Sequence, residues 1–241
     1  EFVQRLRRLS GGKPVGFKLC IGHTWEWFAI AKAMLKTGIT PDFIVVDGAE
    51  GGTGAAPIEF VDHVGTPLRD ALTLVHNTLI GIGLRDRIKI GASGKITSAF
   101  DMARIMALGA DWCNSARAFM FAIGCIQAQQ CHTGRCPTGV ATQDLDRQRA
   151  LVPEDKSKRV AHFHHNTLHA LSELLQAAGL THPDGLSTRH ISVRTSGSKV
   201  TFMSTLYRGI EPGVLLKGNL PSPVYEFGWP MANPDSFAPH S

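Results

Sequence analysis

The sequence lacks the features that mark membrane and secreted proteins. It contains no apolar run of about 18 residues, the length that a membrane-spanning helix needs. It starts at Glu1 rather than at a methionine, and no charged-then-apolar leader follows. We therefore predict a cytoplasmic protein without a membrane span, and we interpret the chain as a piece of a longer protein or a processed product.

Two further absences narrow the class of protein. The cysteines number five, an odd count, in a chain of 241 residues that can bury a sizeable core, which argues against a secreted disulfide scaffold. A strong charge excess is also absent, because the net charge is only +5 and the basic residues are spread out. The basic run RLRRL at residues 5–9 is typical of an amphipathic helix surface. We therefore expect no nucleic-acid partner.

Short apolar runs alternate with helical patterns four times in the first half of the chain. We predict strands at residues 15–19, 43–47, 87–91 and 111–115, and helices near 25–37, 67–83, 97–108 and from about 116. This alternation indicates an α/β fold with a parallel sheet. Four such units are half of a (β/α)₈ barrel or most of a small doubly wound sheet. Both architectures place active sites at the carboxyl ends of the strands.

The pattern changes after the fourth unit. Residues 157–179 have helical periodicity, and from residue 181 onward the chain is rich in proline, glycine and serine. We therefore divide the chain into an α/β region at residues 1–145 and a second region at 146–241. The second region is expected to hold a helical segment and an irregular tail that packs on a partner.

A glycine loop, GAEGGTGAAP at residues 48–57, follows the second strand. Glycine has no Cβ atom, so such a loop can approach a flat ligand closely. It fits neither the P-loop nor the dinucleotide fingerprint. We favour a ligand-binding role over an ordinary flexible loop.

Two further loops, GASGKITSA at 91–99 and NSARAFM at 114–120, follow the third and fourth strands. Backbone amides at helix starts attract phosphate, and Ser93 and Lys95 add a hydroxyl and a charge. In barrels, the loops after the last two strands commonly bind a phosphate, with which Arg117 could pair. The alternatives are an ordinary turn in which Ser93 or Thr97 caps the helix, and an Arg117 that only caps a surface.

One cation stands inside an apolar strand. Lys18 lies in VGFKL, and a buried lysine is unfavourable unless it is paired. We favour a role in contacting a polarised ring or an anionic substrate. If the strand lies at the edge of the sheet, Lys18 is merely solvated.

Three cysteines lie close together in CIQAQQCHTGRCPTGVATQ, at residues 125–143. A proline directly after the last of them is typical of iron–sulfur runs, and three thiolates suit a three-iron cluster or a four-iron cluster with an outside ligand. Zinc, with His132 as a fourth ligand, remains the alternative. The other two cysteines, Cys20 and Cys113, are expected to be core thiols.

In this order, GAEGGTGAAP, ASGKI, ALGAD and the cysteine run resemble the FMN-binding domain of glutamate synthase, from about residue 13 to 145. The stretches NSAR and GCIQA are most similar to the stand-alone glutamate synthase-like FMN proteins. The resemblance implies a (β/α)₈ TIM barrel with FMN at the carboxyl ends of its strands. This chain would hold the last four βα units and a C-terminal extension, and the first four units would lie upstream of Glu1.

The resemblance also assigns residues to roles. It implies a 3Fe–4S cluster on the three clustered cysteines and places Lys18 beside the flavin and 2-oxoglutarate. Two departures weaken the phosphate contacts: the family has Gly-Gly where this chain has Gly94-Lys95, and a glycine-rich loop where it has NSAR. The implied cluster ligands are Cys125, Cys131 and Cys136. The implied FMN contacts are Lys18, Gly51, Gly52, Gly54, Ser93, Gly94, Lys95, Asn114, Ser115, Ala116 and Arg117.

The activity implied by the resemblance is that of a glutamate synthase, an oxidoreductase of nitrogen metabolism acting on CH–NH₂ donors. Ammonia, free or derived from glutamine, condenses with 2-oxoglutarate, and reduced FMN converts the imine to L-glutamate. Electrons come from ferredoxin or a reductase subunit through the cluster. Three alternatives stay open: the same cofactors acting on another substrate, a barrel related to inosine monophosphate dehydrogenase, and a non-catalytic module stabilised by zinc.

Overall fold

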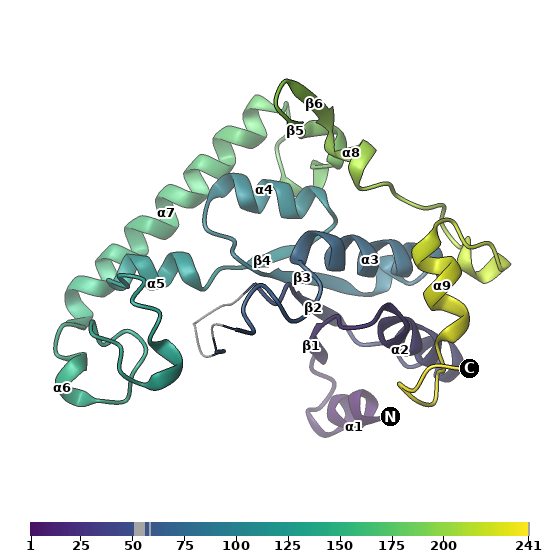
Figure 1. Ribbon diagram of the computed structural model, residues 1–241, viewed down its shortest axis with the longest axis horizontal. Helices are drawn as coiled ribbons and strands as arrows, with labels where there is room; N and C mark the ends of the chain where they lie inside the picture. The colour runs from purple at the N-terminus through teal and green to yellow at the C-terminus, as the bar shows by residue number, and fades with distance from the viewer. Residues whose placement is uncertain (51–55, 58, 241) are drawn as a thin grey trace.

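The computed structural model describes residues 1–50, 56–57 and 59–240. At its centre lies a four-stranded parallel sheet in the order β1-β2-β3-β4 (Figure 1). These strands span Gly16–Cys20, Phe43–Asp47, Lys89–Ser93 and Trp112–Asn114. The predicted α/β class with a parallel sheet is therefore confirmed. Within the described residues the sheet is open, with β1 and β4 at its edges.

Helices connect the strands where the sequence predicts them. α2 (Thr24–Thr37), α3 (Leu68–Gly81) and α4 (Ala99–Ala107) follow the first three strands. They cover one face of the sheet, because alternate strand residues on that face share a single core with α2 and α3. The fully buried strand residues of this face are Ile44, Val46, Ile90 and Ala92.

Aromatic rings lie on the other face of the sheet. A Cβ atom at Gly16 would come within 2.5 Å of the Phe43 ring, and one at Gly91 within 2.5 Å of the Trp112 ring. The two rings also meet edge to face, with centroids 5.8 Å apart. Glycine is therefore required at both positions for the rings to lie over the neighbouring strands.

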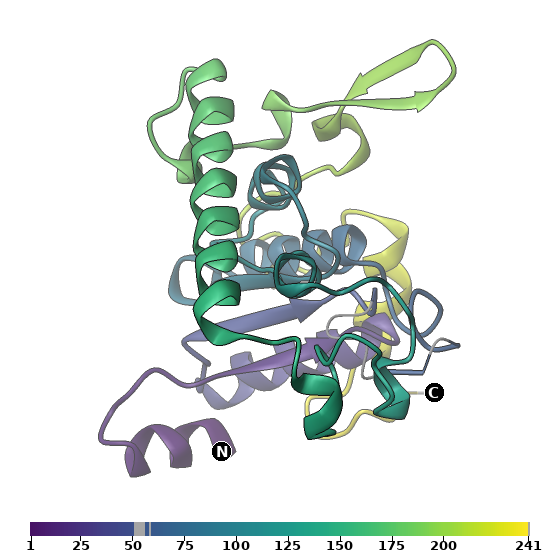
Figure 2. The ribbon, with the colours of Figure 1, turned by 90° about the vertical axis from the view of Figure 1, so that its left-hand side faces the viewer.

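The chain then leaves the sheet through α5 (Arg117–Ile123), the cysteine loop and α6 (Leu145–Gln148). The long helix α7 (Pro153–Ala177) runs along one side of the molecule and packs against α4 and α5 (Figure 2). Its residues Leu171 and Leu175 form a small core with Ala99 and Ala103 of α4. No described helix combines the length and the apolar character that crossing a bilayer requires.

The C-terminal region is more ordered than the sequence predicts. It holds an antiparallel hairpin of β5 (Ser192–Ser196) and β6 (Lys199–Phe202), followed by α8 (Met203–Leu206) and α9 (Pro223–Met231). α9 returns to α2, where the Tyr225 ring stacks on Phe28 with centroids 5.2 Å apart. The expectation of an irregular tail is wrong for these segments. Their few apolar residues are too widely spaced for a periodic pattern, yet they join the main core.

The remaining elements are short. α1 (Phe2–Leu9) precedes the sheet and is tied to it by an ion pair of 2.8 Å between Arg7 and Asp42. Single 3₁₀ turns occur at Arg85–Arg87, Cys131–Thr133, Pro183–Gly185, Thr188–His190 and Leu215–Lys217.

Candidate functional site

Four polar side chains form a row at the carboxyl ends of the parallel strands. The strand register aligns Cys20 with Asp47, Asp47 with Ser93, and Ser93 with Asn114. Aligned residues of neighbouring strands project to the same face, so the row lies on the face that carries the Phe43 ring. The sequence predicts Ser93 and Asn114 as site residues. It does not single out Asp47, although a carboxylate that ends the apolar run FIVVD was a usable signal.

Lys18 belongs to this face and contacts the row. Its Nζ atom lies 2.6 Å from Oδ2 of Asp47 on the neighbouring strand. The lysine side chain is 56% exposed, so the buried lysine considered from the sequence is not what the fold produces. β1 is an edge strand, and the cation is half-solvated but paired. The arrangement places an ion pair at the open end of the sheet.

The loop after β2 is held against the loop after β3. The Gly48 amide donates to the carbonyl oxygen of Ser93 at 2.9 Å. The Glu50 carboxylate accepts from the Leu68 amide at 3.1 Å and so caps the start of α3. A Cβ atom at Gly94 would lie 3.3 Å from Oε2 of Glu50, which shows how closely the two loops approach. The predicted contacts Gly51, Gly52 and Gly54 lie outside the described residues.

The two predicted phosphate loops lie side by side. The Ser115 hydroxyl, just before α5, donates to the carbonyl of Ile96, just before α4, at 2.7 Å. In the described part of the chain, no hydrogen bond accounts for the backbone amides of Lys95, Ile96, Ser115 and Ala116. Unpaired amides at the ends of strands are suitable donors to a phosphate. The structure therefore brings the loops after β3 and β4 together, through the alignment of Ser93 with Asn114 and the hydrogen bond from Ser115 to Ile96.

Lys95 is already engaged in an ion pair. Its Nζ lies 2.5 Å from Oδ2 of Asp62, and both residues adopt left-handed backbone conformations, with φ of 44° and 68°. The lysine thus bridges the loops after β2 and β3. A phosphate in this site would have to share the lysine with Asp62.

The helix cap in this region differs from the sequence expectation. The N-cap of α4 is Ser98, rather than Ser93 or Thr97, and its side chain accepts from the Asp101 amide at 3.1 Å. The Asp101 carboxylate accepts in turn from the Ser98 and Thr97 amides. This reciprocal arrangement is a capping box. Ser93 does not cap the helix and belongs to the polar row.

Among the three cysteines of the loop, Cys136 has a thiol whose pKa is lowered by its surroundings. Burial alone would raise the pKa of its thiol, but the Thr138 hydroxyl and the backbone amides of Ala141, Thr138 and Val140 outweigh burial and lower the pKa. The thiol lies 3.5 Å from the Thr138 hydroxyl. This environment stabilises a thiolate, which is the form that binds iron and zinc.

The other two clustered cysteines are half-buried in the same loop. The Gln127 amide lies 3.5 Å from Sγ of Cys125, and Cys131 opens a 3₁₀ turn. Gln127 itself has a positive φ of 57°. The donor chemistry therefore fits an iron–sulfur ligand set. Across the described residues, however, no three histidine, cysteine or acidic side chains are close enough together to hold a metal ion.

The remaining two cysteines differ from each other. Burial, with a smaller contribution from the Asp101 charge, raises the pKa of Cys113 to about 12, as expected for a core thiol. Cys20 is exposed and ends the polar row, so its prediction as a core thiol is wrong.

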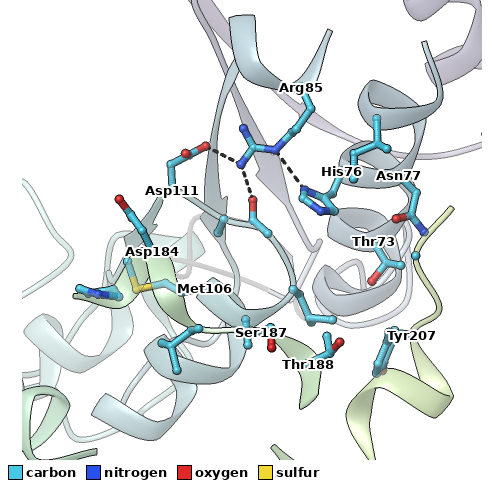
Figure 3. A pocket seen from close by; sticks show the side chains of 18 of the residues that line it. Thr73, His76, Asn77, Arg85, Met106, Asp111, Asp184, Ser187, Thr188 and Tyr207 are labelled. Atoms are coloured by element: carbon cyan, nitrogen blue, oxygen red, sulfur yellow. Dashed lines mark hydrogen bonds and ion pairs between the residues drawn. The ribbon is translucent and has the colours of Figure 1, made fainter. Parts of the chain in front are cut away.

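A second polar cluster, missed by the sequence, lies at the amino end of the sheet beside a cavity of about 390 Å³ (Figure 3). Arg85 donates to Nδ1 of His76 at 3.0 Å, to the Gly109 carbonyl at 2.9 Å and to Oδ2 of Asp111 at 2.8 Å. Burial first, and then the Arg85 charge, lower the pKa of His76 to about 4 against the opposing effect of Asp111. Gly109 and Asp111 stand in the ALGAD stretch, but that stretch gives no signal for its partners Arg85 and His76, so the sequence did not group the four residues.

The sequence of this chain is similar to those of glutamate synthases and glutamate synthase-like proteins. The family model described as a conserved region in glutamate synthase matches residues 1–181. The glutamate synthase large subunit-like protein YerD of Bacillus subtilis is 43% identical over 206 residues, which cover 86% of this chain and 39% of that protein. An archaeal glutamate synthase [NADPH] of Methanocaldococcus jannaschii is 38% identical over 185 residues, covering 77% of this chain and 36% of that protein. The chain therefore spans less than half the length of these relatives.

Solved structures give a weaker likeness. A mutant flavocytochrome b2 with pyruvate bound aligns with a TM-score of 0.44 at 12% identity, covering 91% of this chain and 43% of that one.

Proposed function

This chain belongs to the glutamate synthase family, and on that premise we propose that residues 1–145 form the carboxyl-terminal half of an FMN-binding barrel. The whole protein would catalyse the reductive amination of 2-oxoglutarate to L-glutamate. The observation that carries the proposal is the polar row of Cys20, Asp47, Ser93 and Asn114 at the carboxyl ends of parallel strands. This is the end of a (β/α)₈ barrel at which active sites lie.

The loops after β3 and β4 are the proposed phosphate site. Ser93, Gly94 and Lys95 face Asn114, Ser115, Ala116 and Arg117 across the hydrogen bond from Ser115 to Ile96. Backbone amides of this region that have no partner among the described residues support the assignment, because they would donate to phosphate oxygens. Gly51, Gly52 and Gly54 remain the proposed contacts of the flavin ring. When bound, FMN supplies the hydride chemistry and the protein supplies orientation and electrostatics.

Lys18 is the proposed catalytic residue. Its cation lies on the open face of the sheet and is held by Asp47 at 2.6 Å, which fixes its position at the carboxyl end. From there it would stabilise negative charge on the flavin ring or on a substrate carboxylate. The ion pair with Asp47 orients the lysine before a ligand arrives.

The cysteine loop is the proposed site of a 3Fe–4S cluster. Cys125, Cys131 and Cys136 would be its ligands, and the lowered pKa of Cys136 supports a thiolate at that position. The electron donor would be ferredoxin or a reductase subunit, and the relative from Methanocaldococcus jannaschii carries NADPH in its name. Ammonia, free or derived from glutamine, would be the second substrate.

The test compares Lys18→Ala with Lys89→Ala in the natural full-length protein. Both lysines lie on the same face of the sheet and pair with an aspartate, Lys18 at the carboxyl end and Lys89 at the amino end, where Nζ lies 3.0 Å from Asp111. We expect Lys18→Ala to reduce glutamate formation about 1000-fold, as the loss of a preorganised charge does. Lys89→Ala should leave turnover unchanged.

Absorption spectra and iron analysis accompany the kinetics. The unchanged protein should have flavin bands and about three irons per chain, and Lys18→Ala should keep both. Cys136→Ser should lose the iron but keep the flavin. Zinc in place of iron, or full turnover in Lys18→Ala, would contradict the proposal. Flavin and iron without turnover of 2-oxoglutarate would indicate another substrate.

A further inference from the structure

Helix α7 carries a histidine-rich tract that the proposed function does not use. Four of the eleven histidines of the chain lie within eight positions, at 162, 164, 165 and 169. Short tracts of this kind are typical of metal binding. α7 lies along one side of the molecule, so one of its faces is open to solvent (Figure 2).

The helix period places His162, His165 and His169 along one face and His164 on another. His165 and His169 are four residues apart, so they are neighbours on one face, with Cβ atoms about 5–6 Å apart. Both are exposed. His164 instead meets the Phe119 ring of α5, with ring centroids 6.1 Å apart. The core-facing side of α7 is marked by Leu171 and Leu175.

A carboxylate lies one turn beyond the pair. Oε2 of Glu173 is 3.7 Å from Nδ1 of His169, and both side chains are 67% exposed. A metal-bound histidine usually directs its other ring nitrogen to a carboxylate, which fixes the ring and raises its basicity. A small side-chain adjustment would let Glu173 accept a hydrogen bond from Nδ1 of His169, which would orient the ring and leave its Nε2 atom available for a metal.

We infer that His165 and His169 bind one divalent transition-metal ion of the Cu(II), Ni(II) and Zn(II) group. Two histidines at this helical spacing form the protein half of known metal sites, and imidazole suits these ions. Water would complete the coordination of the ion. The site is on α7, apart from the cysteine loop, and does not depend on the proposed flavin chemistry.

The test is calorimetric titration of the natural full-length protein with Ni(II), without a polyhistidine tag. We expect His165→Ala and His169→Ala each to weaken Ni(II) binding about 100-fold, because each change converts a chelate into a single ligand. Glu173→Gln should weaken binding about 10-fold, as a positioning residue does. The cysteines are the same in every variant, so any contribution from them cancels.

His164→Ala is the matched control. It removes a histidine from another face of the same helix without touching the pair at 165 and 169, so its Ni(II) affinity should equal that of the unchanged protein. Thermal melts establish that the exposed substitutions leave the fold intact. Binding by His169→Ala as tight as that of the unchanged protein overturns the inference, and so does a full loss in His164→Ala.

Discussion

The polar groups at the two ends of the parallel sheet differ in how fully they are hydrogen-bonded. At the amino end, Arg85 donates to four acceptors: Nδ1 of His76, Oδ2 of Asp111 and two backbone carbonyls. Asp111 also accepts from the Ile90 amide at 2.7 Å. At the carboxyl end, the residues aligned across the strands form an open polar row, and neighbouring backbone amides lack partners within the described residues.

This difference suggests that the amino end of the sheet stabilises the fold and that the carboxyl end binds ligands. A closed network of satisfied hydrogen bonds rigidifies the structure, and removing one member exposes the others. Unpaired donors at a surface contribute little to folding and remain available to a ligand. In βα-barrel folds the carboxyl end is the functional one and the amino end the stabilising one. Substitutions at the amino end should therefore change the free energy of unfolding more than substitutions at the carboxyl end.

The largest effect is expected at Gly109, in the amino-end network. Its φ of 108° is unfavourable for other residues, and a Cβ atom there would come within 2.5 Å of the His76 ring. Strain and overpacking together should make Gly109→Ala destabilise the protein by about 4 kcal/mol in urea unfolding.

Gly83→Ala is the control for Gly109→Ala. Gly83 has a φ of 69°, but a Cβ atom there has no atom within 4 Å, so only the backbone strain remains. We expect a loss of about 1 kcal/mol. Equal losses in the two variants would show that contact with His76 does not matter, and the contrast between the two ends would weaken.

The next effect is a pH dependence at the same end. The pKa of His76 falls from its ordinary value of 6.5 to about 4 in the folded protein, mainly through burial. The stability from its neutral form is complete above pH 6.5 and is lost as the pH falls through 4. The expected loss is about 3 kcal/mol of unfolding free energy.

His76→Gln tests this assignment. Glutamine does not titrate, and its amide oxygen can still accept from Nε of Arg85. The variant should lose less stability than the unchanged protein between pH 6.5 and 4, as measured by urea unfolding at each pH. Parallel curves for the two proteins would assign the acid sensitivity to other groups.

The sequence predicts the strands and the helices between them well, because both are set by local periodicity. The FIVVD strand is found at the predicted residues, since an apolar run of this kind fits only a covered sheet. It also predicts which loops meet, because parallel strands bring their carboxyl ends to one edge. The meeting of Ser115 with Ile96 follows from that rule.

Contacts between distant residues could not be predicted. The partner of Lys18 depends on strand order, which aligns it beside Val45 and within reach of Asp47. The Arg85 network joins His76 of α3 to the segments before β3 and β4, and the ALGAD stretch that supplies Gly109 and Asp111 does not reveal these partners. The stacking of Tyr225 on Phe28 also could not be predicted. It depends on the course of the chain between α8 and α9, and the proline- and glycine-rich sequence there has no periodic pattern that would show where the chain returns.

The smallest effect is expected at the carboxyl end, where Ser98 caps α4. Ser98→Ala removes the acceptor for the Asp101 amide but leaves Asp101 bonded to the amides of residues 97 and 98, so one helix donor is lost. Unfolding in urea should measure a loss of about 1 kcal/mol. Ser98→Asp is the control, because it restores an acceptor and should recover most of the loss. A loss as large as that of Gly109→Ala would mean that the carboxyl end also carries the stability of the fold, and the division between the two ends would fail.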